Sequence, residues 1–300
     1  MYRWLRCFVL ISLFLSSPVK ASVTTLPQWW IDLHNYNGYK PWNEYFTLSS
    51  AYFGPNALPV PEVGDGRMPE KHQLEFSTDV YWGFGDQTQS FATRGTYVLV
   101  PGRVCISVWG VLAEHYRTTI AIRNLRASLI KDPEQTLFIG DFYFSTKMRL
   151  LEESRHTPDL NLEVALKTAS SATLRSARYM DTPGYYVDLT AGKTFPVHYS
   201  FFNGFRLVGQ IGFLSYQLNQ EHQNDAPLYG GKVMLLRPNS SVEVGLNGYS
   251  GWMHEGGDHP LVLRGKYQYV HRNKHYFIQY QHAFRDYPYR RLQTGIAIDL

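Results

Sequence analysis

The chain has 300 residues, of which 29 are Lys or Arg and 25 are Asp or Glu, and its pI is about 8.9. Residues 1–21 contain three of the basic residues and no acidic one, so 26 basic and 25 acidic residues remain beyond them. This balance, with Arg and Lys scattered along the chain, gives no indication of nucleic-acid binding. No apolar run of about 20 residues follows residue 21, which excludes a transmembrane helix there. One cysteine, Cys105, remains, which excludes an intramolecular disulfide after processing.

The first 21 residues have the pattern of a secretory signal peptide. Arg3 and Arg6 precede an apolar run over 8–15, and Val19 and Ala21 are the small residues that a cleavage site requires. The apolar run is too short to span a membrane as a helix. We therefore expect residues 1–21 to be cleaved and the protein to act outside the cytoplasm.

Residues 22–72 differ from the rest of the chain because they show no long alternation. They contain several tryptophans and prolines, and the run Pro-Glu-Val-Gly-Asp-Gly at 61–66 is typical of a loop. Two interpretations stay open. The region is an irregular N-terminal arm on the periplasmic side, or it is a plug that folds into the lumen of a barrel.

From residue 73 onwards apolar and polar residues alternate with a period of two, which is typical of strands with one apolar face and one polar face. Short turns or polar loops separate the alternating runs. The pattern predicts twelve strands, over 73–84, 88–100, 104–112, 137–151, 160–167, 184–194, 203–217, 228–237, 242–252, 261–271, 276–285 and 292–300.

The connections also alternate in length. Those at 101–103, 152–158, 195–202, 238–240 and 272–274 are short, whereas the intervening ones include long polar loops at 117–135, 170–183, 218–227 and 253–259. Short turns at one end and longer loops at the other are typical of outer-membrane barrels. We predict an all-β fold: a transmembrane antiparallel up-and-down β-barrel of about twelve strands over 73–300.

The stretch 73–300, ending in the alternating strand Ile-Ala-Ile-Asp-Leu at 296–300, resembles bacterial outer-membrane β-barrel proteins. The last strand is similar to the signal read by the barrel assembly machinery, although Leu300 stands where an aromatic residue is usual. The resemblance implies a porin-like location in the outer membrane. The expected partners are therefore outer-membrane lipid and the assembly machinery.

The polar faces of the predicted strands carry many charges, which must pair or meet water inside a barrel. They leave two alternatives: a lumen filled by paired side chains, or a narrow channel whose basic excess of nine to seven favours small anionic or zwitterionic solutes. The predicted acids are Glu75, Asp79, Asp141, Glu163, Asp188, Glu243 and Asp299. The predicted bases are Arg94, Lys147, Arg149, Lys167, Arg206, Lys232, Arg264, Lys266 and Arg285.

The predicted outer loops offer a weak metal candidate, His254, Glu255, Asp258 and His259, whose spacing matches no zinc signature. Polar loops of this kind are also common without metal. No phosphate-binding loop is present, and we expect no cofactor.

An outer-membrane lipid hydrolase of the phospholipase or lipid A deacylase type is the second hypothesis. His282 is the one histidine predicted in the middle of a strand on the lipid-facing side, but no serine partner can be identified. The sequence therefore favours a non-enzymatic protein that passes or binds a small polar or anionic solute, or a structural surface protein.

Overall fold

The computed structural model describes residues 25–197, 201–218, 223–253 and 256–300. The expected signal peptide lies outside these residues. The chain divides into two compact units, 1–36 and 37–300. Among the described residues, no helix has both the length and the apolar character needed to cross a membrane.

The described part of the first unit is one short helix, α2 (Gln28–His34). Trp30 is buried, and its ring lies 4.7 Å from the ring of His34 and 5.7 Å from that of Tyr36, between centroids. Asn35 ends the helix in the left-handed conformation, which asparagine tolerates better than most residues.

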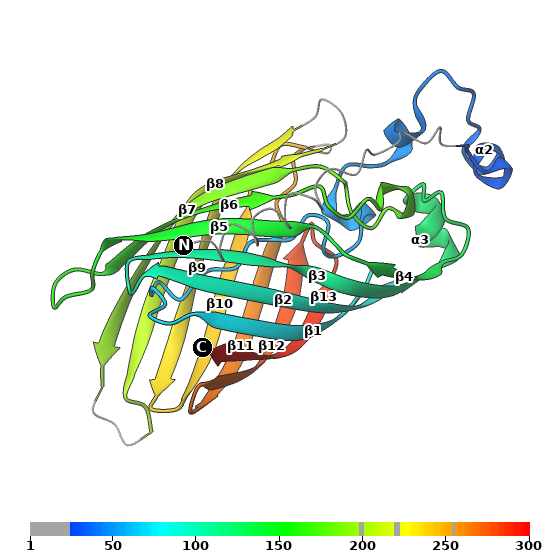
Figure 1. The fold of residues 1–300 in the computed structure, drawn as a ribbon. Coiled ribbons are helices and arrows are strands. Elements are labelled where there is room, and N and C mark those ends of the chain that lie inside the picture. The colour runs from blue at the N-terminus through cyan, green and yellow to red at the C-terminus, as the bar shows by residue number, and fades with distance from the viewer. Residues whose placement is uncertain (1–24, 198–200, 219–222, 254–255) are drawn as a thin grey trace, which may run out of the picture. The chain divides into compact units, whose positions relative to one another are not determined.

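The second unit is a closed antiparallel β-barrel (Figure 1). Twelve strands form the ring, because each pairs with the next and β1 pairs with β13. The strands are β1 (Gln73–Gly83), β2 (Asp86–Val100), β3 (Val104–Thr118), β5 (Phe142–Leu151), β6 (Asp159–Lys167), β7 (Gly184–Pro196), β8 (Gly204–Gln217), β9 (Gln223–Arg237), β10 (Ser240–Tyr249), β11 (Leu261–His271), β12 (Lys274–Arg285) and β13 (Arg290–Asp299). The short elements outside the ring are η1 (Trp42–Tyr45), η2 (Ser50–Tyr52), α3 (Ile120–Leu125), β4 (Glu134–Phe138) and η3 (Leu174–Ser176).

The predicted twelve-stranded barrel is confirmed, with one strand divided. The stretch predicted as a single strand over 137–151 is split between β4 and β5, and the predicted connection 117–135 contains α3 and the first two residues of β4. Ile139 has a φ of 69°, which is uncommon for a β-branched residue. The amides of Ile139 and Gly140 still donate to carbonyls of β3. Because β4 and β5 both lie along β3, the alternation runs through the break and conceals it.

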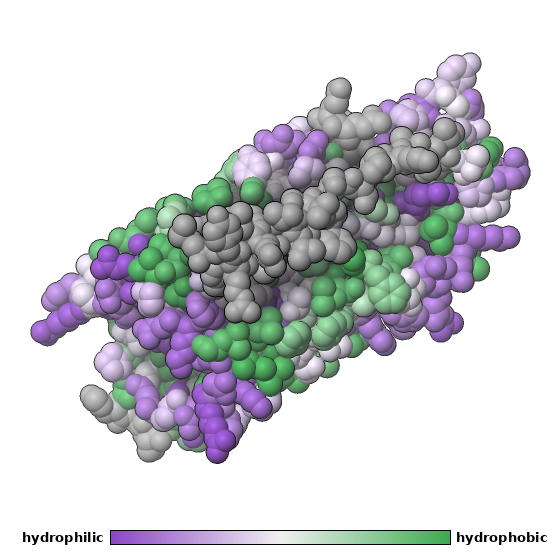
Figure 2. Space-filling model, viewed as in Figure 1, coloured by the Kyte–Doolittle hydropathy of each residue, from purple (hydrophilic) through white to green (hydrophobic). Residues whose placement is uncertain are grey.

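The two faces of the wall follow the alternation. On β10, Val242, Val244 and Leu246 face outward and are exposed, whereas Glu243 and Asn247 face inward and are buried. Apolar residues gather over the strands, with hydrophilic residues at the two ends (Figure 2). An apolar outer band is what the hydrocarbon core of a bilayer requires. Outward-facing tyrosines at 267, 269, 276 and 280 lie on β11 and β12, as the alternation predicts.

The two ends of the barrel differ. The tight turns 101–103, 238–239 and 272–273 lie at the same end as the C-terminus, and the long connections 119–141 and 168–183 lie at the other. Outer-membrane barrels carry their short turns on the periplasmic side. We therefore name the first the periplasmic end and the second the outer end.

The Gly212→Ala variant tests how closely the wall strands pack. A Cβ at Gly212 would lie 2.4 Å from the Val187 carbonyl oxygen of β7, whereas one at Gly209, on the same strand, would meet nothing within 4 Å. We expect Gly212→Ala to lower the free energy of unfolding in urea by about 1–3 kcal/mol, because the added methyl overpacks the wall. Gly209→Ala is the matched control, and equal stability of the two variants would contradict this packing.

Candidate functional site

Residues 53–70, which we name the luminal segment, run through the barrel without joining its sheet. At the outer end, the Tyr289 hydroxyl donates to the Phe53 carbonyl at 2.5 Å and the Tyr287 hydroxyl donates to the Pro55 carbonyl at 2.7 Å. Both tyrosines are buried and lie just before β13. The segment therefore begins among the loops of the outer end.

Along the lumen, side chains near both ends of β8 donate to backbone carbonyls of the segment. The Tyr216 hydroxyl of β8 bonds Pro59 at 2.8 Å. Arg206, lower on β8 and fully buried, donates from Nε to Asp65 and from Nη2 to Gly66, each at 2.8 Å. The segment is thus attached to β8 at two levels.

The luminal segment ends at the periplasmic end. The amide of Gly102, in the turn between β2 and β3, donates to the Pro69 carbonyl at 3.3 Å. Met68 packs in a small buried cluster with Val98 and Cys105. From there the chain reaches the start of β1. The luminal segment therefore extends from the outer end to the periplasmic end of the barrel.

An ion-paired carboxylate lies in the centre of the segment. Glu62 is 2.8 Å from Nη2 of Arg291 and 3.6 Å from Nε of Arg264. Gln279 also donates to it, at 3.2 Å. Arg264 in addition donates to the Val60 carbonyl at 2.8 Å. The wall presents more hydrogen-bond donors than acceptors here. Carboxylate and carbonyl groups of the segment accept hydrogen bonds from these donors.

The sequence of the segment suits this position. Proline has no N–H and favours an extended backbone, so it presents a carbonyl acceptor without a donor to satisfy. The wall around the segment supplies mainly donors, from tyrosine, arginine and asparagine side chains. Such a segment meets the requirement that buried backbone groups be paired without entering the sheet. The prolines are Pro55, Pro59, Pro61 and Pro69.

Beside the segment the lumen keeps a cavity of about 830 Å³. Its lining extends from Gln73 and His275 at the periplasmic end to Asn56 and Tyr287 at the outer end. The described lining contains nine carboxylates and eight Lys or Arg side chains. The basic excess expected from the wall is therefore balanced, in part by acids of the luminal segment.

Some of the predicted lumen residues line the cavity, whereas others form ion pairs away from it. Arg149 lies at the periplasmic end, 3.5 Å from Asp159, and is absent from the cavity lining. Lys167 is buried 2.6 Å from Asp141. Arg285 is 62% exposed at the outer end of β12, where it pairs with Asp286, and does not line the cavity. The predicted residues that line the cavity are Glu75, Asp79, Arg94, Asp141, Lys147, Glu163, Lys232, Glu243, Arg264, Lys266 and Asp299.

An aromatic surface forms part of the cavity wall. The Trp109 and Tyr143 rings stack with centroids 5.1 Å apart, and the Arg94 guanidinium lies 4.3 Å above the Trp109 ring. On β11 and β12, Lys266 lies 4.8 Å above the Phe277 ring. Cation–π contacts of this kind hold a basic side chain against the wall while its charge still faces the cavity.

A buried ionic network, which we name the outer-end cluster (Asp86, Glu114, Arg126 and Arg178), joins the outer loops to the wall. Arg178 donates to Glu114 at 2.8 Å and to Asp86 at 2.5 Å. Arg126 also donates to Asp86, at 2.5 Å. Arg126 follows α3 and Arg178 follows η3, so two long loops converge on one pair of strands. Burial disfavours the charged guanidinium of Arg178, but Glu114 and Asp86 outweigh it and raise its pKa.

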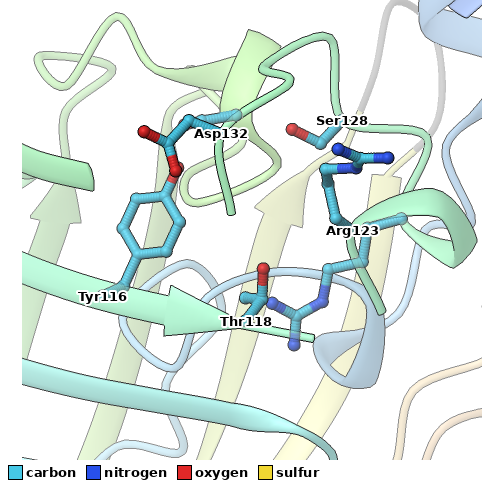
Figure 3. Close-up of a pocket in the computed structure, with 7 residues that line it drawn as sticks. Tyr116, Thr118, Arg123, Ser128 and Asp132 are labelled. Carbon is cyan, nitrogen blue, oxygen red and sulfur yellow. The ribbon is translucent and has the colours of Figure 1, made fainter. Parts of the chain in front are cut away.

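A second, much smaller pocket lies beside this cluster (Figure 3). Tyr116 of β3 and Asp132 point toward one another there, and Thr118, Arg123 and Ser128 also line the pocket. Its volume of about 10 Å³ leaves room for about one water molecule. The pocket is therefore too small to bind a substrate.

Of the four residues of the metal candidate in the outer loops, the structure describes two. His254 and Glu255 lie outside the described residues. Asp258 is buried, which raises its pKa, and it accepts a hydrogen bond from Asn224 at 2.7 Å. The His259 amide donates to Asp286. Within the described part of the chain, no group of three His, Cys, Asp or Glu side chains has the geometry to hold a metal ion.

His282 lies on the outward face of β12, as the alternation predicts. Its ring contacts that of Phe284 edge-on, with centroids 5.0 Å apart. The wall residues beside it in the sheet are Leu263 and its own neighbours on β12. This surrounding gives no support to a nucleophilic site at His282.

No protein-family model and no curated protein matches the chain. Among solved structures, the chain is similar to an outer-membrane channel from Pseudomonas putida F1, at 11% identity and a TM-score of 0.52, over 80% of this chain and all of that one. It also matches the transport unit of the autotransporter AIDA-I from Escherichia coli, at 9% identity and a TM-score of 0.48, over 87% and 99% of the two chains. The protein is a twelve-stranded outer-membrane β-barrel. Identities this low show a similarity of fold alone.

Sequence reasoning missed the luminal segment's acids and the arginines of the outer-end cluster. Glu62 and Asp65 lie in the stretch 61–66, which the sequence predicts as a loop, and Arg126 and Arg178 lie in predicted long polar loops. The one available signal was the density of prolines and aromatic residues before β1, which indicates a segment that packs without forming regular structure.

Arg178→Ala tests the outer-end cluster. Removal of this guanidinium leaves two buried carboxylates short of a partner, so we expect the free energy of unfolding in urea to fall by about 3–5 kcal/mol. Arg175→Ala, an exposed arginine three residues earlier, should change it by less than about 0.5 kcal/mol. Adding Glu114→Gln to Arg178→Ala should recover part of the loss, and its failure to do so would argue against an electrostatic origin.

Proposed function

We propose that this barrel is a narrow outer-membrane channel for small polar solutes, and that the luminal segment restricts its bore. The observation that carries the proposal is the charged cavity of about 830 Å³, whose lining extends from one end of the barrel to the other. A cavity of this size accommodates a small organic solute. Charged and polar walls replace part of the hydration that such a solute loses on entry.

The position of the luminal segment supports a restricted channel rather than a wide pore. Its backbone carbonyls are bonded to Tyr216 and Arg206 on one side of the barrel, and Glu62 is ion-paired with Arg264 and Arg291 on the other. A solute that crosses must pass beside the segment or displace it. Contacts at several levels keep the segment in the solute's path.

The balanced charge of the cavity lining favours a polar or zwitterionic solute while the luminal segment is in place. The described cavity carries nearly equal numbers of carboxylates and basic groups, because Glu62 and Asp65 offset bases of the wall. The wall alone is expected to prefer anions. This preference would emerge only if Glu62 and Asp65 were neutralised or moved out of the lumen. The luminal segment thus affects selectivity as well as bore.

The double variant Glu62→Ala/Tyr216→Phe tests the restriction. It removes the central ion pairs and one hydrogen bond to a segment carbonyl, and it leaves the backbone pairing of the wall strands intact. We expect single-channel conductance in planar bilayers to rise severalfold over the wild type, because a weakened segment leaves the bore more often. Glu152→Ala/Tyr269→Phe is the matched control, since both positions are exposed and lie outside the lumen.

If the wild type and both double variants fail to conduct and fail to admit small sugars into liposomes, the channel proposal is wrong. Heat-modified gel migration of each sample establishes that the barrel is folded before conductance is compared. A rise in conductance for the control pair as well would show that the effect does not arise in the lumen.

Glu62→Gln/Asp65→Asn tests the charge balance. The wild-type lining should give a reversal potential near zero in a potassium chloride gradient. The variant converts a slight acidic majority into a basic one, so its reversal potential should move toward the chloride equilibrium value. Glu152→Gln, at the exposed periplasmic turn, is the control and should leave the potential unchanged.

A further inference from the structure

The direction of the luminal segment has a topological consequence. Phe53 lies at the outer end, where Tyr289 holds its carbonyl, and Pro69 lies at the periplasmic end beside the turn at Gly102. The chain therefore runs inward along the lumen and then enters β1 from the periplasmic end. Figure 1 shows this stretch, coloured blue to cyan, between the end that carries α3 and β4 and the start of β1.

The residues just before the segment also contact the outer end. The Ser50 hydroxyl donates to the Asp286 carbonyl, in the turn between β12 and β13, at 2.7 Å. The Tyr52 ring lies 6.2 Å from that of Phe84, in the turn between β1 and β2. Both turns belong to the outer end. The chain preceding the lumen is thus fixed on that side at two separate turns.

The length of the segment agrees with a complete crossing. Its 18 residues, at roughly 3.1 Å each in an extended proline-rich conformation, reach about 55 Å. The bilayer with its headgroups is about 40–45 Å thick. The segment can therefore span the barrel with residues to spare at each end, where its carbonyls bond Tyr289 and Gly102.

We propose that the protein is threaded through its own barrel, so that residues 37–52 are displayed on the outer face of the membrane. The barrel would then serve as the passage by which its own N-terminal stretch reaches the cell surface. The proposal concerns the side of the membrane on which residues 37–52 lie, and it holds whether or not solutes also cross the barrel. Part of the stretch is open to solvent, with Tyr39 91% exposed.

The side chains that line the path favour a stable threaded state. Arg206 binds two consecutive carbonyls of the segment and at the same time pairs with Glu153 and Asp159 of the wall. Gly66 adopts a φ of 68° where it passes within about 3 Å of Gly192, measured from the position its Cβ would take. Such a close approach of two glycines is specific to one alignment of the segment in the lumen.

Cysteine labelling on intact cells tests the display. The wild type is a suitable background because Cys105 is only 2% exposed. We expect Tyr39→Cys to react with a membrane-impermeant maleimide attached to a polymer too large for the lumen. Ile120→Cys, in α3 at the outer end, should react likewise, whereas Asn239→Cys, in a periplasmic turn, should react only after the cells are lysed. Labelling of Tyr39→Cys only after lysis overturns the proposal.

A luminal disulfide tests the path itself. The Val63 side chain lies 2.5 Å from the position that a Cβ at Gly230 would take, so Val63→Cys/Gly230→Cys should form a disulfide seen as a faster band on non-reducing gels. Val63→Cys/Gly95→Cys is the control, because a Cβ at Gly95 meets nothing within 4 Å. Surface labelling at residue 39 without the luminal disulfide would mean that the stretch reaches the surface by another path, and would equally overturn threading.

Discussion

The arrangement of the lumen depends on the pairing of a donor-rich wall with a segment that supplies acceptors. Arg206 is the clearest case. Its guanidinium is fully buried, yet Asp65 and Gly66 provide carbonyls while Glu153 and Asp159 provide carboxylates. A buried arginine without such partners would be strongly unfavourable. The wall and the segment therefore satisfy one another's buried polar groups.

The same complementarity extends to net charge. The wall presents a cluster of basic groups to the cavity, and Glu62 of the segment meets two of them, Arg264 and Arg291. Neutralising these charges from within lets the barrel keep basic side chains in its lumen without mutual repulsion. A solute that enters meets a balanced surface, and this is the physical basis of the selectivity that we propose.

At the outer end, ion pairs of a different kind hold the loops. Arg178 and Arg126 come from two separate loops and share Asp86 of β2. These pairs are removed from solvent, so they are much less screened by salt than exposed ones. The long outer loops consequently behave as part of the barrel, and they form the packed surroundings in which the luminal segment begins.

Sequence reasoning predicted the barrel well because membrane strands obey a local rule. Each residue faces either lipid or lumen, so the alternation along β10, and the side on which Glu243 and Val244 fall, can be determined without knowledge of any other strand. By the same rule Lys147 and Glu163 fall on the inward side, and both line the cavity. It did not reveal the local break at Ile139, because the alternation is preserved on both sides of it.

The sequence by itself thus determined the strands, their faces and the membrane in which they lie. Only the tertiary structure decided what fills the lumen. Arg291, which pairs with Glu62, and the Asp65 carbonyl that Arg206 binds lie more than a hundred residues from their partners and follow no periodic pattern. A proline-rich stretch has the same sequence features in a solvated arm and in a barrel. Its place is decided by the donors that surround it, and these come together only when the barrel closes.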